Sequence, residues 1–320
     1  MSYKPIIIVA GEPNSIFLEI FFKSFKIKIK SPLILIASKN LVISQMRKLK
    51  FKKKLRLIDC KKLSKYKLDN KYVNLINVDY KQIKPFEKIS KKSNKYIDNC
   101  FDIAFKIIDE GYSDKFINGP ISKKNYLNSK HLGITEFISK KYAIKSSAML
   151  IYNKNLSVCP VTTHLPLKLV TKNINKKSII DKICLIDKFY KKNIGLKAKI
   201  GVLGLNPHCE SISKFKEDEK IIEPAINYLK KLNIKVSGPY SADTAFLKEN
   251  RKKFDIIVGM YHDQVLTPIK TLYEYDAINI TLGLPFTRIS PDHGPNEKMI
   301  GKNKSNPLSL IRSIKFLDTN

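Results

Sequence analysis

The sequence predicts an α/β fold with a mostly parallel sheet, because short apolar runs alternate with longer stretches of helical periodicity. The short runs are rich in β-branched residues, as strands buried on both faces are. We expect strands at Ile6–Val9, Leu33–Ala37, Lys115–Ile117, Ser157–Val161, Ala198–Leu205 and Phe254–Met260, and helices at Ser15–Phe25, Lys92–Asp109, Lys123–Leu127, Thr135–Tyr142, Lys176–Tyr190, Asp218–Lys231 and Asn306–Phe316. Residues 46–98, rich in Lys and Asn, are expected to form a surface-facing part of the first half of the chain.

At 320 residues the chain is long enough for one large domain, or for two that share a cleft. No apolar run reaches the roughly 18 residues of a membrane span, and Met1–Val9 is interpreted as a first strand, too short for a signal peptide. The five cysteines are odd in number and form no CxxC pair. Such thiols are typical of a reducing compartment, so a cytoplasmic location is expected.

The net charge of +32 comes almost entirely from lysine. Only Arg47, Arg56, Arg251, Arg288 and Arg312 are arginine, the residue that nucleic-acid-binding proteins favour for bidentate contacts with bases and phosphates. Trp, which could stack on bases, is absent. We therefore interpret the charge as a solvated Lys-rich surface and expect no specific nucleic-acid partner, apart from incidental attraction to polyanions at low salt.

Three of the five histidines follow predicted strands and are candidate metal ligands. His164 follows Ser157–Val161, His208 follows Ala198–Leu205, and His262 follows Phe254–Met260. Ligands of open parallel sheets bind beyond the carboxyl ends of the strands. One histidine in such a place is usually structural, but three together predict a site for Zn²⁺ or a similar ion, and Asp263 could orient one of the rings. His131 and His293 have no strand immediately before them and are not expected to be ligands.

The chain beyond His262 carries polar side chains that would suit an anionic substrate. Lys270, Asn279 and Arg288 are spaced by nine residues, so we expect them at separate loop or strand-end positions rather than on one helix face. Arg288 stands out in a Lys-rich chain because a guanidinium suits bidentate binding of phosphate or carboxylate, although a structural salt bridge is the alternative. The loop after the first strand lacks GxGxxG, so a nicotinamide cofactor would need a site other than the usual Rossmann one.

Seven segments in order resemble the signature segments of the 4-hydroxythreonine-4-phosphate dehydrogenase family. They are Gly119–Lys123, Gly133–Phe137, Val161–His164, Gly204–His208, Gly238–Pro239 with Ala242–Thr244, Met260–Gln264 and Asn279–Pro285. The resemblance covers roughly residues 6–316. It implies a homodimer of chains with two α/β lobes, like isopropylmalate and isocitrate dehydrogenases, with the active site in the cleft between the lobes. The first lobe would comprise residues 1–125 and 303–320, and the second, with the metal ligands and the dimer interface, residues 126–302.

The resemblance also implies roles for individual residues. His164, His208 and His262 would bind a divalent metal ion (Zn²⁺, Mg²⁺ or Co²⁺), with one ligand crossing the dimer interface. The substrate would be bound by Thr135, Lys270, Asn279 and Arg288. Catalysis would be supported by Lys123, Asp243 and Asp263. NAD or NADP would be bound by His293, Gly294 and Lys298. The family reaction oxidises 4-phosphooxy-L-threonine to 2-amino-3-oxo-4-phosphooxybutanoate, which decarboxylates to 3-amino-2-oxopropyl phosphate in pyridoxal phosphate biosynthesis.

Four departures from the family pattern bear on activity. Ile134 stands where a His usually precedes Thr135, and both Ser15–Glu19 and Glu210–Glu217 lack the usual glycines. Lys298 replaces an acidic residue in the loop that holds the adenine ribose, which favours NADP⁺ because a Lys suits a 2′-phosphate, with drift toward Lys as the alternative. Two further functions therefore stay open: a dehydrogenase of D-threonate or D-erythronate 4-phosphate with the same metal ligands, and a divergent relative of low activity.

Overall fold

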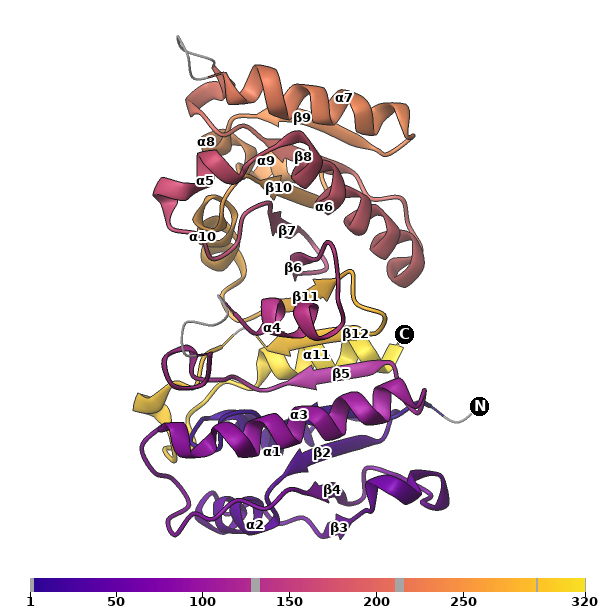
Figure 1. The fold of residues 1–320 in the computed structure, drawn as a ribbon, viewed down its shortest axis with the longest axis vertical. Coiled ribbons are helices and arrows are strands. Elements are labelled where there is room, and N and C mark those ends of the chain that lie inside the picture. The colour runs from indigo at the N-terminus through magenta and orange to yellow at the C-terminus, as the bar shows by residue number, and fades with distance from the viewer. Residues whose placement is uncertain (1–2, 128–132, 211–215, 292, 320) are drawn as a thin grey trace. The chain divides into compact units, whose positions relative to one another are not determined.

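The computed structural model describes residues 3–127, 133–210, 216–291 and 293–319. The chain forms two compact units, and each is described by itself (Figure 1). Unit 1 comprises Met1–Glu136 and Pro285–Asn320, and unit 2 comprises Phe137–Leu284. The sequence placed the return to the first lobe at residue 303, but the structure places it at 285, because a strand at 287–291 pairs with the last strand of the first segment.

Unit 1 contains a fully parallel set of strands in the order β3-β4-β2-β1-β5-β12. The strands are β1 (Ile6–Val9), β2 (Leu33–Ala37), β3 (Leu55–Leu57), β4 (Val73–Asn77), β5 (Lys115–Asn118) and β12 (Thr287–Pro291). Every residue of β1 is 0% exposed, which explains why its sequence is continuously apolar instead of alternating.

The helices of unit 1 cover this sheet. They are α1 (Phe17–Ser24), α2 (Lys39–Lys48), α3 (Asn94–Asp109) and α11 (Leu308–Thr319), with the shorter turns η1 (Cys60–Lys65), η2 (Lys91–Ser93), η3 (Lys123–Leu127) and η7 (Glu297–Met299). Helix α3 packs on β1 and β2, and α11 packs on β12 and β1. The rings of Phe101, Phe105, Phe116 and Phe286 form an aromatic cluster beneath α3. The helix α4 (Ile134–Lys141) contains the boundary between the units.

The loops after β1 and β5 meet closely. A Cβ at Gly11 would collide with the carbonyl oxygen of Pro120, and a Cβ at Gly119 would collide with that of Ala10. Gly11 also has a φ of +75°, which favours glycine. Backbone hydrogen bonds join the two loops, from Gly119 N to Val9 O at 2.8 Å and from Glu12 N to Pro120 O at 2.8 Å. The two glycines therefore allow a backbone-to-backbone contact at the carboxyl end of β1.

Unit 2 contains the strand order β11-β6-β7-β10-β8-β9. The strands are β6 (Ala148–Tyr152), β7 (Ser157–Pro160), β8 (Ile200–Leu203), β9 (Val236–Tyr240), β10 (Ile256–Gly259) and β11 (Ile278–Leu282). Strand β6 is antiparallel to β11 and to β7, whereas β7, β10, β8 and β9 run parallel to one another. The fold class is thus the expected one, with a mixed and mostly parallel sheet.

The helical segments of unit 2 are α5 (Leu167–Asn173), α6 (Lys176–Phe189), η4 (Tyr190–Ile194), η5 (Pro207–Cys209), η6 (Asp218–Ile222), α7 (Glu223–Lys231), α8 (Ala242–Ala245), α9 (Lys248–Arg251) and α10 (His262–Tyr273). Helix α6 begins with a capping box between Asn175 and Ser178. Helix α10 buries Val265 and Ile269 in a core cluster with residues of β7, β8 and β10. This packing fixes the helix that begins at His262.

The six predicted strands and seven predicted helices are all present, with ends shifted by a few residues. Strands β3, β4, β6, β9, β11 and β12 were missed. Residues 46–98 are more deeply buried than expected, because β4 lies inside the sheet and Val73 and Leu75 are 0% exposed. The sequence indicated a surface-facing region because charged residues outnumber the apolar residues in this segment.

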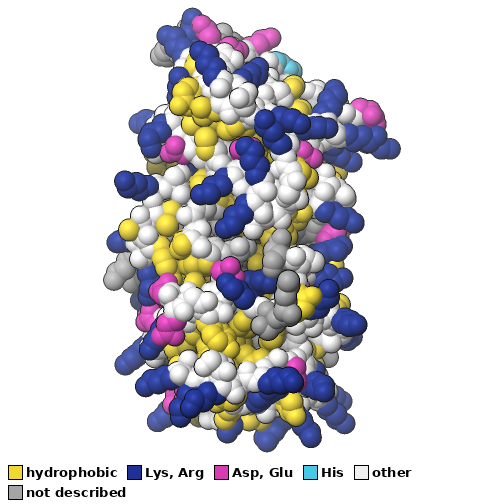
Figure 2. All heavy atoms as spheres, turned by 90° about the vertical axis from the view of Figure 1, so that its right-hand side faces the viewer, with side chains coloured by type: hydrophobic (Ala, Val, Ile, Leu, Met, Phe, Trp, Pro, Cys, Tyr) yellow, Lys and Arg dark blue, Asp and Glu magenta, His cyan; other side chains and the backbone are white. Residues whose placement is uncertain are grey.

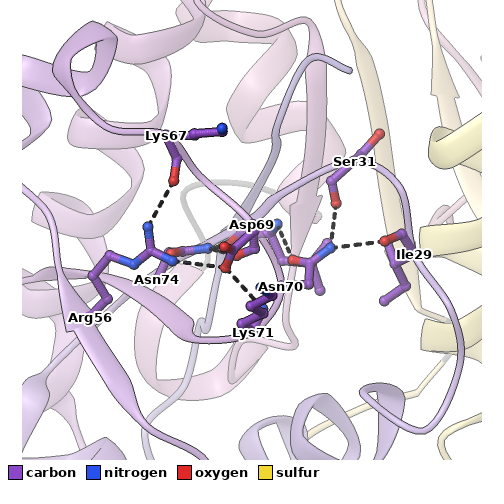
Figure 3. A network of polar contacts seen from close by, with 9 residues as sticks. Ile29, Ser31, Arg56, Lys67, Asp69, Asn70, Lys71 and Asn74 are labelled. Carbon is purple, nitrogen blue, oxygen red and sulfur yellow. Dashed lines mark hydrogen bonds and ion pairs between the residues drawn. The ribbon is translucent and has the colours of Figure 1, made fainter. Parts of the chain in front are cut away.

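A polar network fixes the loop that leads into β4 (Figure 3). Arg56 donates to the Lys67 carbonyl oxygen at 2.9 Å and to Asp69 Oδ1 at 2.8 Å. Asn70 Nδ2 donates to the carbonyl oxygens of Ile29 at 3.2 Å and Ser31 at 2.9 Å, and Asn70 Oδ1 accepts from Leu33 N at 2.9 Å. One amide side chain thus holds the chain that enters β2.

Asn70→Ala is expected to lower the free energy of unfolding by about 1–3 kcal/mol, because three half-buried backbone groups lose their partner. Urea denaturation measures the effect. Lys67→Ala is the matched control, since the network uses only the backbone oxygen of that residue. Equal stability of the two variants would contradict the anchoring role of Asn70.

Lysine and arginine side chains are distributed over most of the face shown in Figure 2 and do not gather into one stripe. Within the described residues, no helix is both long enough and apolar enough to cross a bilayer. The five cysteines are free. Burial raises the pKa of the Cys100 and Cys159 thiols to about 12, so these two behave as small core residues.

Candidate metal and substrate site

The sheet of unit 2 brings His164 and His262 together. Strands β7 and β10 are parallel neighbours in the register Gly259↔Pro160, so their carboxyl ends lie side by side. Thr162 Oγ1 donates to the Met260 carbonyl oxygen at 2.8 Å and joins the two following loops. The two imidazole centroids lie 6.0 Å apart with the rings inclined by 40°. Because metal–nitrogen bonds are about 2.0–2.1 Å long, two rings at this separation can share one divalent ion.

Asp263 contacts the imidazole ring of His262. Its Oδ1 is 2.7 Å from Nδ1 of His262, while the Asp263 side chain itself is 80% exposed. In the tautomer that donates from Nδ1 to this carboxylate, Nε2 of His262 is the lone-pair nitrogen. Histidines that bind metals usually donate their other ring nitrogen to such a partner. The contact predicted from the sequence for Asp263 is therefore present.

His208 lies apart from this pair, on an exposed turn of unit 2. It belongs to η5 and has a φ of 56°. The Ser241 hydroxyl, which donates to Asp243 Oδ1 at 2.7 Å, holds the pKa of Asp243 below its usual value, and the positive charge of protonated His208 acts in the same direction. Within the described part of one chain, no group of three or more His, Cys, Asp or Glu side chains could hold a metal ion. Within that part of the chain, His164 and His262 thus form a pair of imidazoles without a third ligand.

Arg288 in unit 1 is completely buried, at 0% exposure. Its Nε donates to Asn118 Oδ1 at 2.8 Å and its Nη1 donates to Thr135 Oγ1 at 2.9 Å. Burial lowers the pKa of the guanidinium to about 10, an effect that the nearby Glu136 opposes, so Arg288 is charged at neutral pH. The structure thus brings together two of the predicted substrate residues, Arg288 and Thr135. Sequence reasoning missed Asn118, whose only signal was its place at the end of β5 before Gly119-Pro120.

Lys270 and Asn279 lie in unit 2. Lys270 is in the last turn of α10, where burial lowers its pKa. Asn279 is the second residue of β11, opposite Ile151 of β6, and its Oδ1 is buried with no hydrogen-bond partner among the described residues. Such an acceptor costs free energy unless a ligand or water donates to it. The three residues Lys270, Asn279 and Arg288 lie on three separate elements, as expected. Asn279 and Arg288 are the second residues of β11 and β12, whereas Lys270 lies in a helix and not in a loop or at a strand end.

The predicted cofactor residues lie in the loop after β12. This loop contacts the start of α1. Ile16 N donates to Pro295 O at 3.2 Å, and the ring centroids of Phe17 and His293 lie 6.5 Å apart. A Cβ at Gly294 would meet nothing within 4 Å, and Lys298 is exposed on η7. The predicted residue Lys123 is in η3, but its side chain lies outside the described residues, as does His131.

Glu12 is a buried carboxyl group that the sequence did not single out. It is 2% exposed, and its two oxygens accept from Asn14 N at 3.2 Å and from the Ser93 hydroxyl at 3.1 Å. Burial raises its pKa, with a smaller contribution from the charge of Glu297, and the two hydrogen bonds oppose this rise. The only available signal was its position directly after a buried strand.

Glu12→Gln is expected to stabilise the protein relative to the wild type, and increasingly so as the pH rises. The pKa of Glu12 is raised in the folded state, so its favourable contribution is complete below its ordinary value of 4.5 and is lost as the pH rises through the folded pKa. Glutamine does not titrate. Thermal denaturation of both proteins between about pH 4 and pH 8 measures the difference, and a constant gap in melting temperature across this range would contradict the assignment.

Comparisons with known proteins give a consistent result. A family described as "Pyridoxal phosphate biosynthetic protein PdxA" matches residues 28–317. A 4-hydroxythreonine-4-phosphate dehydrogenase from Sulfurihydrogenibium sp. is 40% identical over 249 residues, which are 76% of this chain and 75% of the relative. A D-threonate 4-phosphate dehydrogenase from Pectobacterium atrosepticum is 33% identical over 220 residues, 68% of each chain. The structure of a putative 4-hydroxythreonine-4-phosphate dehydrogenase from Salmonella typhimurium superposes with a TM-score of 0.85, at 27% identity and 98% coverage of both chains.

Proposed function

The chain belongs to the PdxA family of pyridoxal phosphate biosynthetic proteins, and on this premise we propose that it oxidises 4-phosphooxy-L-threonine with NAD(P)⁺. The product, 2-amino-3-oxo-4-phosphooxybutanoate, then decarboxylates to 3-amino-2-oxopropyl phosphate. The observation that carries the proposal is the pair of imidazoles of His164 and His262, 6.0 Å apart at two strand ends, with Asp263 on one ring. The five free thiols support the expected cytoplasmic location.

His164, His262 and the His208 of a second copy would hold a divalent ion of the group Zn²⁺, Mg²⁺ and Co²⁺. When bound, such an ion acts as a Lewis acid toward a hydroxyl or carbonyl oxygen of the substrate. Asp263 fixes the His262 ring and so selects the nitrogen that faces the ion. Asn279 offers its buried Oδ1 to a donor of the substrate, Lys270 supplies a partly desolvated ammonium group, and Arg288, oriented by Asn118 and Thr135, supplies a fixed positive charge.

The exposure of His208 supports a homodimer in which each site borrows a ligand. Large apolar side chains of unit 2 are also exposed, including Leu167 at 70%, Leu247 at 57% and Tyr240 at 37%, and exposed apolar surface is typical of subunit interfaces.

Mixing His208→Ala and His262→Ala subunits provides a test of the shared site. Each pure variant is expected to be inactive, whereas hybrid dimers contain one site with all three imidazoles and regain a fraction of the wild-type activity. Subunit exchange followed by an activity assay measures this. Failure to regain activity, with hybrids demonstrated by mass spectrometry, would contradict the shared site.

The function itself is tested by the near-ultraviolet absorbance of NADH or NADPH formed from 4-phosphooxy-L-threonine with Zn²⁺, Mg²⁺ or Co²⁺. A second candidate substrate class is D-threonate or D-erythronate 4-phosphate, favoured by Ile134, which begins α4 beside Thr135 where the family usually has a His, and by the relative from Pectobacterium. A kcat/KM at least tenfold higher on either sugar-acid phosphate would favour this class. No turnover on any of the three would indicate the divergent relative.

Lys298 is proposed to favour NADP⁺ over NAD⁺ within the loop formed by His293, Gly294 and Lys298. We expect a higher kcat/KM with NADP⁺, and Lys298→Asp is expected to reverse the order, because a carboxylate repels the 2′-phosphate and accepts from a free 2′-hydroxyl. Lys298 is exposed, so the variant should fold normally. Equal or better kcat/KM of the wild type with NAD⁺ would contradict the assignment.

A further inference from the structure

The loop that carries His208 is held at its base by a side chain of α10. Gln264 Nε2 donates to the Gly204 carbonyl oxygen at 2.7 Å, and Gln264 Oε1 accepts from Met260 N at 2.6 Å. Gly204 directly follows β8, and Met260 directly follows β10, its parallel neighbour. A single amide therefore joins the strand end that precedes His208 to the strand end that precedes His262. Since Met260 O also accepts from Thr162, the loops of all three histidines are tied to one residue, Met260.

A buried carboxylate holds the next two residues of the same loop. Asp218, at the start of η6, is 0% exposed. Its Oδ1 accepts from Leu205 N at 2.7 Å, and its Oδ2 accepts from Asn206 N at 3.1 Å and from Asn206 Nδ2 at 2.8 Å. An ionised carboxylate only accepts hydrogen bonds, so it matches these three N–H groups.

The turn beyond this base is one that amino acids with a side chain rarely adopt. His208 and Cys209 have φ values of 56° and 60°, both in the left-handed region. The turn brings Cys209 back onto the base of the loop, since a Cβ at Gly204 would lie 2.6 Å from Cys209 Sγ and 2.7 Å from Asp218 Oδ1. The direction of the exposed His208 ring thus depends on the contacts that Gly204, Cys209 and Asp218 make at the base of the loop.

We propose that Asp218 and Gln264 are positioning residues that fix the His208 loop and present its imidazole outward, toward a metal ion held by a second copy of the chain. The inference rests on the proposed function for the role of His208 itself. Neither residue touches the metal or the substrate in this proposal. They act by removing freedom from the two peptide groups between Gly204 and Asn206, which precede the ligand, so that the ring is in place before the metal binds.

Two near-isosteric substitutions test the proposal. Asp218→Asn replaces one acceptor oxygen by an NH₂ group that faces N–H donors. Gln264→Glu replaces the donor to the Gly204 carbonyl oxygen by an oxygen that repels it, and gives the same test if Asp218→Asn does not fold. Asp187→Asn is the matched control, because Asp187 is also buried in unit 2, at 8% exposure, and binds Lys191 Nζ at 2.6 Å in α6, outside the loop.

The first measurement is hydrogen exchange of the full-length, metal-free protein, read in peptides that cover residues 203–210. The second is the affinity for Co²⁺, followed by its visible absorption bands. We expect faster exchange in these peptides and Co²⁺ affinity lower by about 10–100-fold in both test variants. Asp187→Asn should leave both properties within about threefold of the wild type, and His208→Ala is included to report the contribution of the ligand itself.

Unchanged exchange in residues 203–210 would overturn the proposal that these side chains fix the loop. Faster exchange with wild-type Co²⁺ affinity, while His208→Ala binds Co²⁺ weakly, would overturn the positioning role and leave the proposed function intact. Wild-type Co²⁺ affinity of His208→Ala would remove His208 from the metal site, and both the proposed ligand set and this inference would fail. An equal loss of affinity in Asp187→Asn would show a general effect of destabilisation and also overturn the proposal.

Discussion

His208→Ala is expected to abolish formation of NADH or NADPH, with kcat/KM lower by at least about 10³-fold, or about 4 kcal/mol of barrier. The imidazole would complete a metal site that His164 and His262 of one chain leave with two ligands. His208 is exposed on η5, so the melting temperature should stay within about 2 °C of the wild type. Initial rates with 4-phosphooxy-L-threonine and thermal denaturation measure both effects.

Glu210→Ala is the matched control for this experiment, because Glu210 is exposed on the same loop two residues further along. It should retain wild-type turnover within about twofold. If His208→Ala itself retains turnover within about tenfold, which is only ~1.4 kcal/mol of barrier, the assignment of His208 to the metal is wrong.

Arg288→Lys is expected to lower kcat/KM by about 10²–10³-fold and the free energy of unfolding by about 2–4 kcal/mol. A lysine keeps the charge but cannot reproduce the two N–H groups that reach Asn118 and Thr135 from one planar guanidinium. Steady-state kinetics and urea denaturation separate the two consequences.

Arg47→Lys, at an exposed position of α2, controls for the general effect of exchanging an arginine. A purely structural Arg288 would lower stability in Arg288→Lys without raising KM for the phosphorylated substrate. An unchanged KM together with a kcat/KM within about threefold of the wild type would therefore remove Arg288 from the substrate site.

The sequence predicted the strands that precede the histidines because these strands are almost entirely apolar. Ile256–Gly259 is completely buried, and burial on both faces leaves a signal that needs no knowledge of neighbours. By contrast, β9 reads Val-Ser-Gly-Pro-Tyr and is only partly buried, so its composition indicates a turn. Strand β12 was missed because Arg288, a residue usually exposed, lies inside it at 0% exposure.

The same limit applies to the site. Position after a strand predicted that His164 and His262 lie near each other, because the parallel register of β7 and β10 aligns their ends. It could not predict that His208, which follows an adjacent strand, turns outward. That direction depends on the left-handed backbone at His208 and Cys209 and on the contacts of Asp218 and Gln264, which join segments that are far apart in the sequence.

The contact between Gly11 and Gly119 limits how far the composition of this chain can drift. The chain has 60 Lys and Arg but only 12 Gly, and the buried Ser15 stands where the family pattern has a glycine. At these two positions any side chain would drive one loop into the carbonyl group of the other. Whatever the composition of the surrounding surface, these two positions should therefore accept only glycine, because any replacement would separate the loops after β1 and β5.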